Sequence, residues 1–184
     1  MRCNLRRPIP SVYLLLLVVS FQTLGSPAVA QKYLFGRADF GTGNNPSSVA
    51  IGDFNRDGKQ DLVVTDFADN TVSVFLGKLG ATFATKVDYQ TGNGPVAVTV
   101  GDFNGGGKLE LAIANLNDNT ISILLGNGNG TFRNRVDYAT ALGPTYVFAA
   151  DLNRDRKLDL VVSTQSLAVS VLLGNGVTAR DLYR

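Results

Sequence analysis

The chain has 184 residues with 17 basic and 15 acidic side chains, which gives a formal net charge of +2. It contains no His, and Cys3 is its one Cys, so the composition excludes Ser-His-Asp and Cys-His catalysis, zinc fingers, thiol redox chemistry and haem attachment through Cys. Without residues 1–30 the charge becomes −1, and a nearly neutral chain has no electrostatic pattern for nucleic acid or an anionic membrane. We therefore expect neither as a partner.

The first 30 residues have the layout of a secretory signal peptide. Arg2, Arg6 and Arg7 precede an apolar run over residues 12–21, and small residues end the segment at Ala30. A transmembrane anchor needs about 20 apolar residues, and this run is too short. The sequence therefore predicts cleavage after Ala30 and a mature chain without a membrane span. We expect that chain to be secreted or at the cell surface, where calcium is plentiful.

Internal repetition dominates the rest of the chain. The motif GDFNRDGKQDL begins at Gly52, returns as GDFNGGGKLEL at Gly101, and returns again as ADLNRDRKLDL at Ala150, a step of 49 residues each time. The third copy has one residue fewer near residues 165–168. Repetition at this period indicates a repeat architecture. The predicted units are residues 31–81, 82–130 and 131–177, with 178–184 as a tail.

Each unit reads as four short antiparallel strands. In the first unit, residues 49–54 lead into an Asp/Gly loop and residues 61–65 leave it. Residues 71–76 alternate polar and apolar side chains, as a half-buried strand does, and residues 84–89 read as a shorter strand. Four strands per 40–50 residues are typical of a propeller blade. The predicted fold is all-β, with three four-stranded antiparallel propeller blades.

Three blades are fewer than the four to eight of a typical propeller. A stack that stays open would expose the outer faces of its terminal blades. Two alternatives stay open at this point. Two or more chains assemble into a ring as a homo-oligomer, or the sequence is a fragment of a larger surface protein.

The Asp/Gly loop has the donor pattern of a calcium site. In the first copy, Asp53, Asn55, Asp57 and Asp61 occupy positions 1, 3, 5 and 9. Alternating positions can turn the first three side chains inward, and the main-chain carbonyl of Lys59 can add a fourth ligand. Calcium prefers six to eight hard oxygen ligands. Gly58 permits the left-handed turn that would bring Asp61 back to the ion. An EF-hand is excluded because position 12 is Val64, and an Asx-turn without metal is the alternative.

The three copies of this loop are not equal. The second has Gly106 at position 5, and the third has Arg156 where the first has Gly58, which costs about 1–2 kcal/mol if that residue is left-handed. We expect calcium affinity to decrease from the first loop to the third and then to the second. The candidate metal ligands are Asp53, Asn55, Asp57, Lys59 and Asp61, then Asp102, Asn104, Lys108 and Glu110, then Asp151, Asn153, Asp155, Lys157 and Asp159.

The pattern G-D-F-N-x-D-G-x-x-D-L followed by N-T-x-S-V-x-L-G resembles the FG-GAP/VCBS repeat family, the calcium-loop blades of integrin-α-like β-propellers. The resemblance spans the whole mature chain. It implies an extracellular propeller with structural calcium in the blade loops and a role in adhesion or in binding a protein or carbohydrate ligand. The middle loop departs from the family pattern at Gly106.

The acids outside the loops bear on the alternative of a carbohydrate-active enzyme with paired carboxylates. These acids include Asp66, Asp69, Asp88, Asp118 and Asp137. Most of them recur at the same position of the repeat, and recurrence is more typical of turns and strand caps than of a single active site. The sequence therefore favours a calcium-binding adhesion or ligand-binding module over an enzyme. It does not identify the ligand.

Overall fold

The computed structural model describes residues 36–175. The chain divides into two compact units, Met1–Asp39 and Phe40–Arg184, and every strand lies in the second. The predicted signal peptide and its cleavage point after Ala30 lie outside the described residues, as does the predicted tail at 178–184. Between residues 36 and 175, no helix is long and apolar enough to cross a membrane.

Residues 36–175 form strands and turns, with eleven strands and no helix. The first sheet contains β1 to β4, the second contains β5 to β8, and the third contains β9 to β11; in each, neighbours in sequence pair antiparallel. The bounds are β1 Pro46–Gly52, β2 Asp61–Asp66, β3 Thr71–Phe75, β4 Val87–Gln90, β5 Pro95–Gly101, β6 Glu110–Asn115, β7 Thr120–Leu124, β8 Val136–Ala139, β9 Pro144–Ala150, β10 Asp159–Thr164 and β11 Val169–Leu172. The all-β antiparallel prediction is confirmed.

The described residues contain three strands of the third sheet. The place of a fourth strand, one repeat beyond β8, lies outside those residues. The sheets also divide the chain later than the predicted units, between Gln90 and Pro95 and between Ala139 and Pro144. A boundary at residue 81 falls between β3 and β4, which pair with each other in the first sheet.

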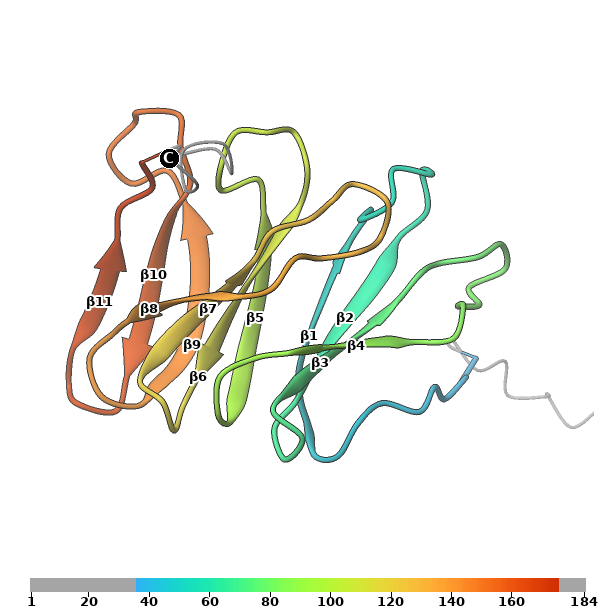
Figure 1. The fold of residues 1–184 in the computed structure, drawn as a ribbon, viewed down its shortest axis with the longest axis horizontal. Helices are drawn as coiled ribbons and strands as arrows, with labels where there is room; N and C mark the ends of the chain where they lie inside the picture. Colours follow the sequence, from blue (N-terminus) through green and yellow to red (C-terminus); the bar gives the residue numbers. More distant parts are fainter. Residues whose placement is uncertain (1–35, 176–184) are drawn as a thin grey trace, which may run out of the picture. The chain divides into compact units, whose positions relative to one another are not determined.

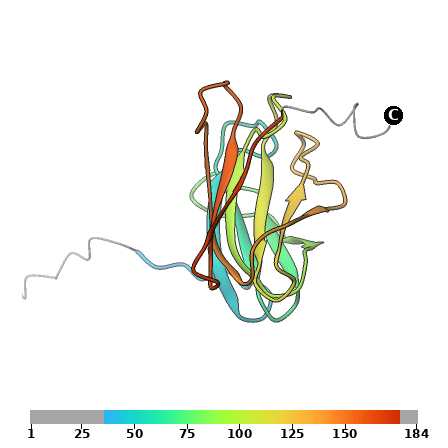
Figure 2. The same cartoon turned by 90° about the vertical axis from the view of Figure 1, so that its left-hand side faces the viewer.

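The three sheets stack face to face. Figure 1 shows the second sheet between the other two, and Figure 2 shows the stack with the third sheet facing the viewer. One apolar core joins the first and second sheets and includes Val63, Val74 and Leu111. Another joins the second and third sheets and includes Ile121 and Val162. These cores fix the spacing and orientation of the loops that connect the strands, since protein interiors are close-packed.

Strand β3 is more buried than its alternating sequence predicts. All five residues of β3 are buried, including the polar Thr71 and Ser73. One face contributes Val72 and Val74 to the core between the first two sheets. The other face includes Phe75, which packs on Phe83, and Ser73, which makes hydrogen bonds. The half-buried prediction for residues 71–76 is therefore wrong, because both faces of the strand are covered.

Candidate functional site

Three equivalent loops join the first and second strands of the three sheets, at residues 53–60, 102–109 and 151–158. Figure 1 shows them along the same edge of the stacked sheets, at the top in this view. The first two loops are in contact, because the Arg56 guanidinium donates a hydrogen bond to the carbonyl oxygen of Gly107. The Gly130 N–H also donates to the Phe54 carbonyl oxygen at 3.0 Å, which ties the second sheet to the first loop.

In the first loop, side-chain oxygens gather around the backbone. The Asp57 N–H donates to Asp53 Oδ1 at 3.1 Å and to Asn55 Oδ1 at 3.0 Å. The N–H groups of Gly58 and Lys59 donate to Asp53 Oδ2 and Asp57 Oδ1, each at 2.9 Å. The oxygens at positions 1 and 3 therefore share one backbone donor, and the loop closes on its own side chains.

The other two loops repeat these contacts. In the third, the Asp155 N–H donates to Asp151 Oδ1 at 3.1 Å and to Asn153 Oδ1 at 3.0 Å. In the second, the Gly106 N–H donates to the corresponding oxygens of Asp102 at 3.0 Å and Asn104 at 2.7 Å. The same loop conformation thus forms whether position 5 is Asp or Gly, and what the second loop lacks is the carboxylate at that position.

Two positions of each loop have positive φ. Gly58 has φ of 80°, as expected from the sequence, and Arg156 occupies the same left-handed conformation with φ of 70°. Position 4 is also left-handed, with φ of 62° at Arg56 and 66° at Arg154. The loop pattern did not predict this second left-handed position, although Gly105 stands there in the second copy and was the available signal.

Replacing Arg156 by Gly should stabilise the protein by about 0.5–1 kcal/mol. A left-handed non-Gly residue costs about 1–2 kcal/mol, and the greater entropy of Gly in the unfolded chain cancels part of the gain. The Arg156 N–H that donates to Asp151 is retained in the variant. Urea unfolding measures the change. The matched reverse variant, Gly58→Arg, should lose a similar amount, and a shift of both in the same direction would contradict the backbone account.

The carboxylate at position 9 has a role that the sequence analysis did not foresee. Asp61 is buried, and its two oxygens accept the N–H groups of Phe54 at 2.8 Å and Gly77 at 2.7 Å. Asp159 does the same with Leu152 and Gly174. In this structure the position-9 carboxylate therefore clamps the loop to the turn that follows the third strand of its sheet.

The donor set fits calcium in its chemistry, because positions 1, 3 and 5 of the first and third loops offer carboxylate and amide oxygens. Within residues 36–175, however, no three His, Cys, Asp or Glu side chains converge as a metal-holding group. Asp57 is already paired, since Lys59 Nζ lies 2.8 Å from its Oδ2. An exposed pair of this kind contributes about 0–1 kcal/mol, so an ion could displace the ammonium at low cost.

Hydrogen bonds keep two of these carboxylates ionised. Lys59, through its ammonium and its backbone N–H, holds the pKa of Asp57 below its ordinary value. The N–H groups of Gly174 and Leu152 hold the pKa of Asp159 below its ordinary value. Both groups stay negatively charged at neutral pH, which is the state that a cation requires.

Glu110 behaves differently at position 9 of the second loop. Its oxygens accept the Phe103 N–H at 2.8 Å and the Asn104 side-chain amide at 3.0 Å. Burial raises the pKa of Glu110 to about 7; the charge of Asp102 adds to this, and the Phe103 N–H opposes it. The second loop therefore combines a missing carboxylate at position 5 with a position-9 acid that holds its proton more tightly. Both features weaken it as a cation site.

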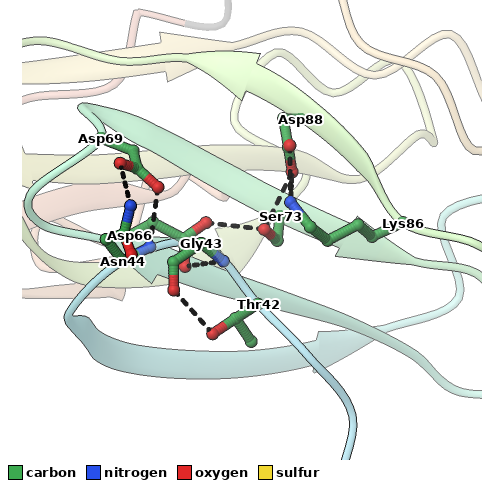
Figure 3. Close-up of polar contacts among 8 residues, drawn as sticks. All are labelled: Thr42, Gly43, Asn44, Asp66, Asp69, Ser73, Lys86 and Asp88. Carbon is green, nitrogen blue, oxygen red and sulfur yellow. Dashed lines mark hydrogen bonds and ion pairs between the residues drawn. The ribbon is translucent and has the colours of Figure 1, made fainter.

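Acids outside the loops form a polar network on the first sheet (Figure 3). Ser73 Oγ lies 2.6 Å from Asp66 Oδ2 and 2.9 Å from Asp88 Oδ1. Asp66 accepts the Gly43 N–H at 2.9 Å, and Lys86 Nζ lies 2.5 Å from Asp88. The second sheet repeats the arrangement with Asn115, Ser122, Asp137 and Arg135. The network therefore belongs to the repeat.

The family model for the FG-GAP-like repeat matches residues 53–113 and 103–162, which together are more than half of the chain. The chain belongs to the FG-GAP-like repeat family. Each match begins in one Asp-rich loop or beside it and ends in the second strand of the following sheet. The FG-GAP-like repeats form a β-propeller-like module of stacked sheets, and the suspected family is confirmed.

Two solved structures are similar in fold to this FG-GAP-like repeat chain. One is the crystal structure of BBS1N in complex with ARL6DN, soaked with lead, at 19% identity and a TM-score of 0.49, covering 71% of this chain and 40% of that one. The other is the Tc holotoxin pore of Photorhabdus luminescens, at 19% identity and a TM-score of 0.46, covering 67% of this chain and 6% of that one. This chain thus spans less than half of either protein. Among curated proteins, none matches it.

Proposed function

We propose that this FG-GAP-like repeat chain is an exported, non-catalytic binding module, stabilised by calcium in its Asp-rich loops, that binds an extracellular protein or carbohydrate. The observation that carries the proposal is the shared geometry of the first and third loops. In both, the side-chain oxygens of positions 1 and 3 accept the backbone N–H of position 5, and the carboxylate of position 5 accepts the N–H of position 7. Hard oxygens at this spacing are what calcium prefers.

The residues that would hold calcium are those at positions 1, 3 and 5, namely Asp53, Asn55 and Asp57 in the first loop and Asp151, Asn153 and Asp155 in the third. Bound calcium would neutralise the clustered carboxylates and hold each loop to its sheet. The backbone clamp by Asp61 and Asp159 keeps each loop next to its own sheet. The expected affinity order remains first, third and then second.

Calcium should raise the melting temperature by about 4 °C for each site that it fills. Extracellular calcium modules have Kd of about 10⁻⁴–10⁻³ M, so 1 mM calcium is about tenfold above a Kd of 10⁻⁴ M and adds about 1.4 kcal/mol per site. About 1 kcal/mol shifts the melting temperature by about 2–4 °C in a chain of this size. Thermal unfolding with calcium and with EDTA measures the shift, and isothermal titration counts the sites.

The double variant Asp53→Asn, Asp57→Asn should remove the tightest site and leave the third loop. Its matched control is Asp118→Asn, which neutralises a carboxylate outside the loops that accepts the Asn93 N–H at 2.6 Å. The control should retain all calcium binding. Identical melting curves with calcium and EDTA, or three equivalent sites in the titration, would contradict the calcium part of the proposal.

Export is tested separately. When the full chain is expressed in a cell with a secretory pathway, mass spectrometry of the protein in the medium should show Gln31 as the first residue. Retention of the uncleaved chain inside the cell would contradict export without affecting calcium binding. A non-catalytic role is supported by the absence of His from the whole sequence and by repeated rather than unique acids.

A further inference from the structure

The same two faces meet at both internal interfaces of the stack. At the first interface, the first sheet contributes Val63 and Val72, and the second contributes Leu111 and Ile113. At the second interface, the second sheet contributes Ala112 and Ile121, which lie one repeat after Val63 and Val72. The third sheet contributes Leu160 and Val162, which lie one repeat after Leu111 and Ile113. Each sheet therefore has a forward face for the next sheet and a backward face for the preceding one.

The two ends of the stack expose one face of each kind. The backward face of the first sheet has Val49 and Ile51 at 61% and 60% exposure. They are the equivalents of Val98 and Val100, which pack against the first sheet inside the chain. The forward face of the third sheet exposes Tyr146, Phe148, Leu152, Val169 and Val171. The exposed forward face of the third sheet and the exposed backward face of the first sheet are therefore complementary, because a forward face packs on a backward face at both interfaces within the chain.

The third sheet also has an unpaired edge. In the first and second sheets, β3 and β7 pair with β4 and β8, whose sequences are VDYQ and VDYA. Within the described residues, β11 has no partner on that side. An exposed edge presents a row of free N–H and C=O groups that can accept a further strand.

Residues 37–40 resemble the outer strands β4 and β8 in sequence and in local contacts. Their sequence, RADF, lies one repeat before KVDY and RVDY at residues 86–89 and 135–138. Arg37 pairs with Asp39 at 2.8 Å, as Lys86 pairs with Asp88 and Arg135 with Asp137. Yet residues 37–40 lie in no strand. Within residues 36–175, one outer-strand sequence therefore lies outside any sheet, and the third sheet has no outer strand.

A cavity lies between the second and third sheets, beside the residues that correspond to the ring contacts of Phe132 at the first interface. It has a volume of about 170 Å³ and is lined by residues including Phe103, Tyr138 and Leu172. At the first interface the equivalents of Phe103 and Tyr138 are Phe54 and Tyr89, and each packs against the ring of Phe132 at 5.4 Å between centroids. Phe132 comes from the segment that leads into the outer strand β8.

We propose that copies of this chain associate head to tail. The forward face of the third sheet in one copy packs on the backward face of the first sheet in the next, and residues 37–40 of that next copy pair antiparallel with β11 as the fourth strand. The repeat sets the register: Ser73 lies opposite Asp88 and Ser122 opposite Asp137, so Ser170 lies opposite the Asp39 of the other copy. The Ser170 hydroxyl then donates to that carboxylate, as Ser122 does to Asp137 at 2.6 Å.

Disulfide trapping tests this register in the full chain. In a Cys3→Ser background, Asp39→Cys with Ser170→Cys places two thiols opposite each other, where Cβ atoms of paired strands lie about 4.5–5.5 Å apart. Mild oxidation should give disulfide-linked dimers or longer oligomers on a non-reducing gel. The matched control, Ala38→Cys with Ser170→Cys, points one thiol to the opposite face and should give at least tenfold less.

Light scattering tests the two faces without cysteine chemistry. The full chain should be a dimer or a longer oligomer, whereas Ile51→Asp and Phe148→Asp should each be monomeric. An equimolar mixture of these two variants should associate again, because each retains the face that the other lacks. Leu79→Asp, at an 84% exposed turn residue outside both faces, should leave association unchanged. Circular dichroism and melting curves confirm that each variant is folded.

Several outcomes would overturn the proposal. A monomeric full chain would mean that the end faces do not bind a second copy. Loss of association in only one of the two face variants would indicate an interface between like faces. A disulfide within one chain would mean that residues 37–40 pair with β11 of their own copy. None of these readouts depends on calcium, so the proposal stands apart from the proposed function.

Discussion

Replacing Gly126 by Ala should lower the free energy of unfolding by about 3 kcal/mol, because a Cβ there would collide with the backbone of the residue that precedes β6. Its nearest neighbour is the carbonyl oxygen of Leu109, which cannot rotate away as a side chain can. Gly77 and Gly174 face the carbonyl oxygens of Gln60 and Leu158 in the same way. Urea unfolding of the variant measures the loss directly.

Gly41→Ala is the matched control for this prediction. A Cβ at Gly41 would meet no atom within 4 Å, and its φ is not positive. The control should change the free energy of unfolding by less than about 0.5 kcal/mol. A loss of less than about 1 kcal/mol in Gly126→Ala would mean that the turn after the third strand can move away from the strand beside it.

The stability of the protein should fall between pH 4 and pH 8 through the titration of Glu110. Its pKa in the folded state, about 7, exceeds the ordinary value of 4.5, because burial disfavours the charged form. The folded protein therefore binds this proton more tightly than the unfolded chain does. The stabilisation is fully present below the unfolded pKa and is lost as the pH rises through about 7. Allowing for solvent screening, we expect a loss of about 2 kcal/mol.

Glu110→Gln isolates this contribution, since Gln is neutral at every pH and can accept the Phe103 N–H. Urea unfolding of both proteins in EDTA-containing buffer gives the difference in unfolding free energy against pH, which should favour the variant increasingly toward pH 8. Asp69→Asn is a control of opposite sign: the Asn44 N–H lowers the pKa of Asp69, so its contribution is lost as the pH falls. A difference curve for Glu110→Gln that is flat between pH 4 and pH 8 would refute the prediction.

The conformation of the first Asp/Gly loop, residues 53–60, was predictable from the local sequence only in part. The left-handed turn at Gly58 and the clustering of Asp53, Asn55 and Asp57 were predictable, because both depend on hydrogen bonds within five residues. The local pattern did not predict that the carboxylate of Asp61 accepts the N–H of Gly77, sixteen residues away. Only the pairing of β2 with β3 brings those two residues together.

The role of the Leu-Gly pair after the third strand of each sheet was also not predictable from the local sequence. Its recurrence at Gly77, Gly126 and Gly174 was visible in the sequence as a mark of the repeat, yet it suggested only a turn. In the structure, the missing side chain lets the turn approach the carbonyl of the residue just before β2, β6 or β10. The recurrence of Gly at this position was the available signal that two backbones come close, but the sequence does not say which two.

By itself, the sequence determined the period of 49 residues, the antiparallel β character of each unit and the loop that separates its first two strands. These depend on alternation, turn residues and repetition, which are local properties of the chain. The tertiary structure alone decided which faces of the sheets meet and that β3 is covered on both sides. It also decided that, within residues 36–175, β11 is the last strand of the third sheet and residues 37–40 lie in no strand. Those outcomes depend on contacts between distant segments, which packing selects from many that the local pattern allows.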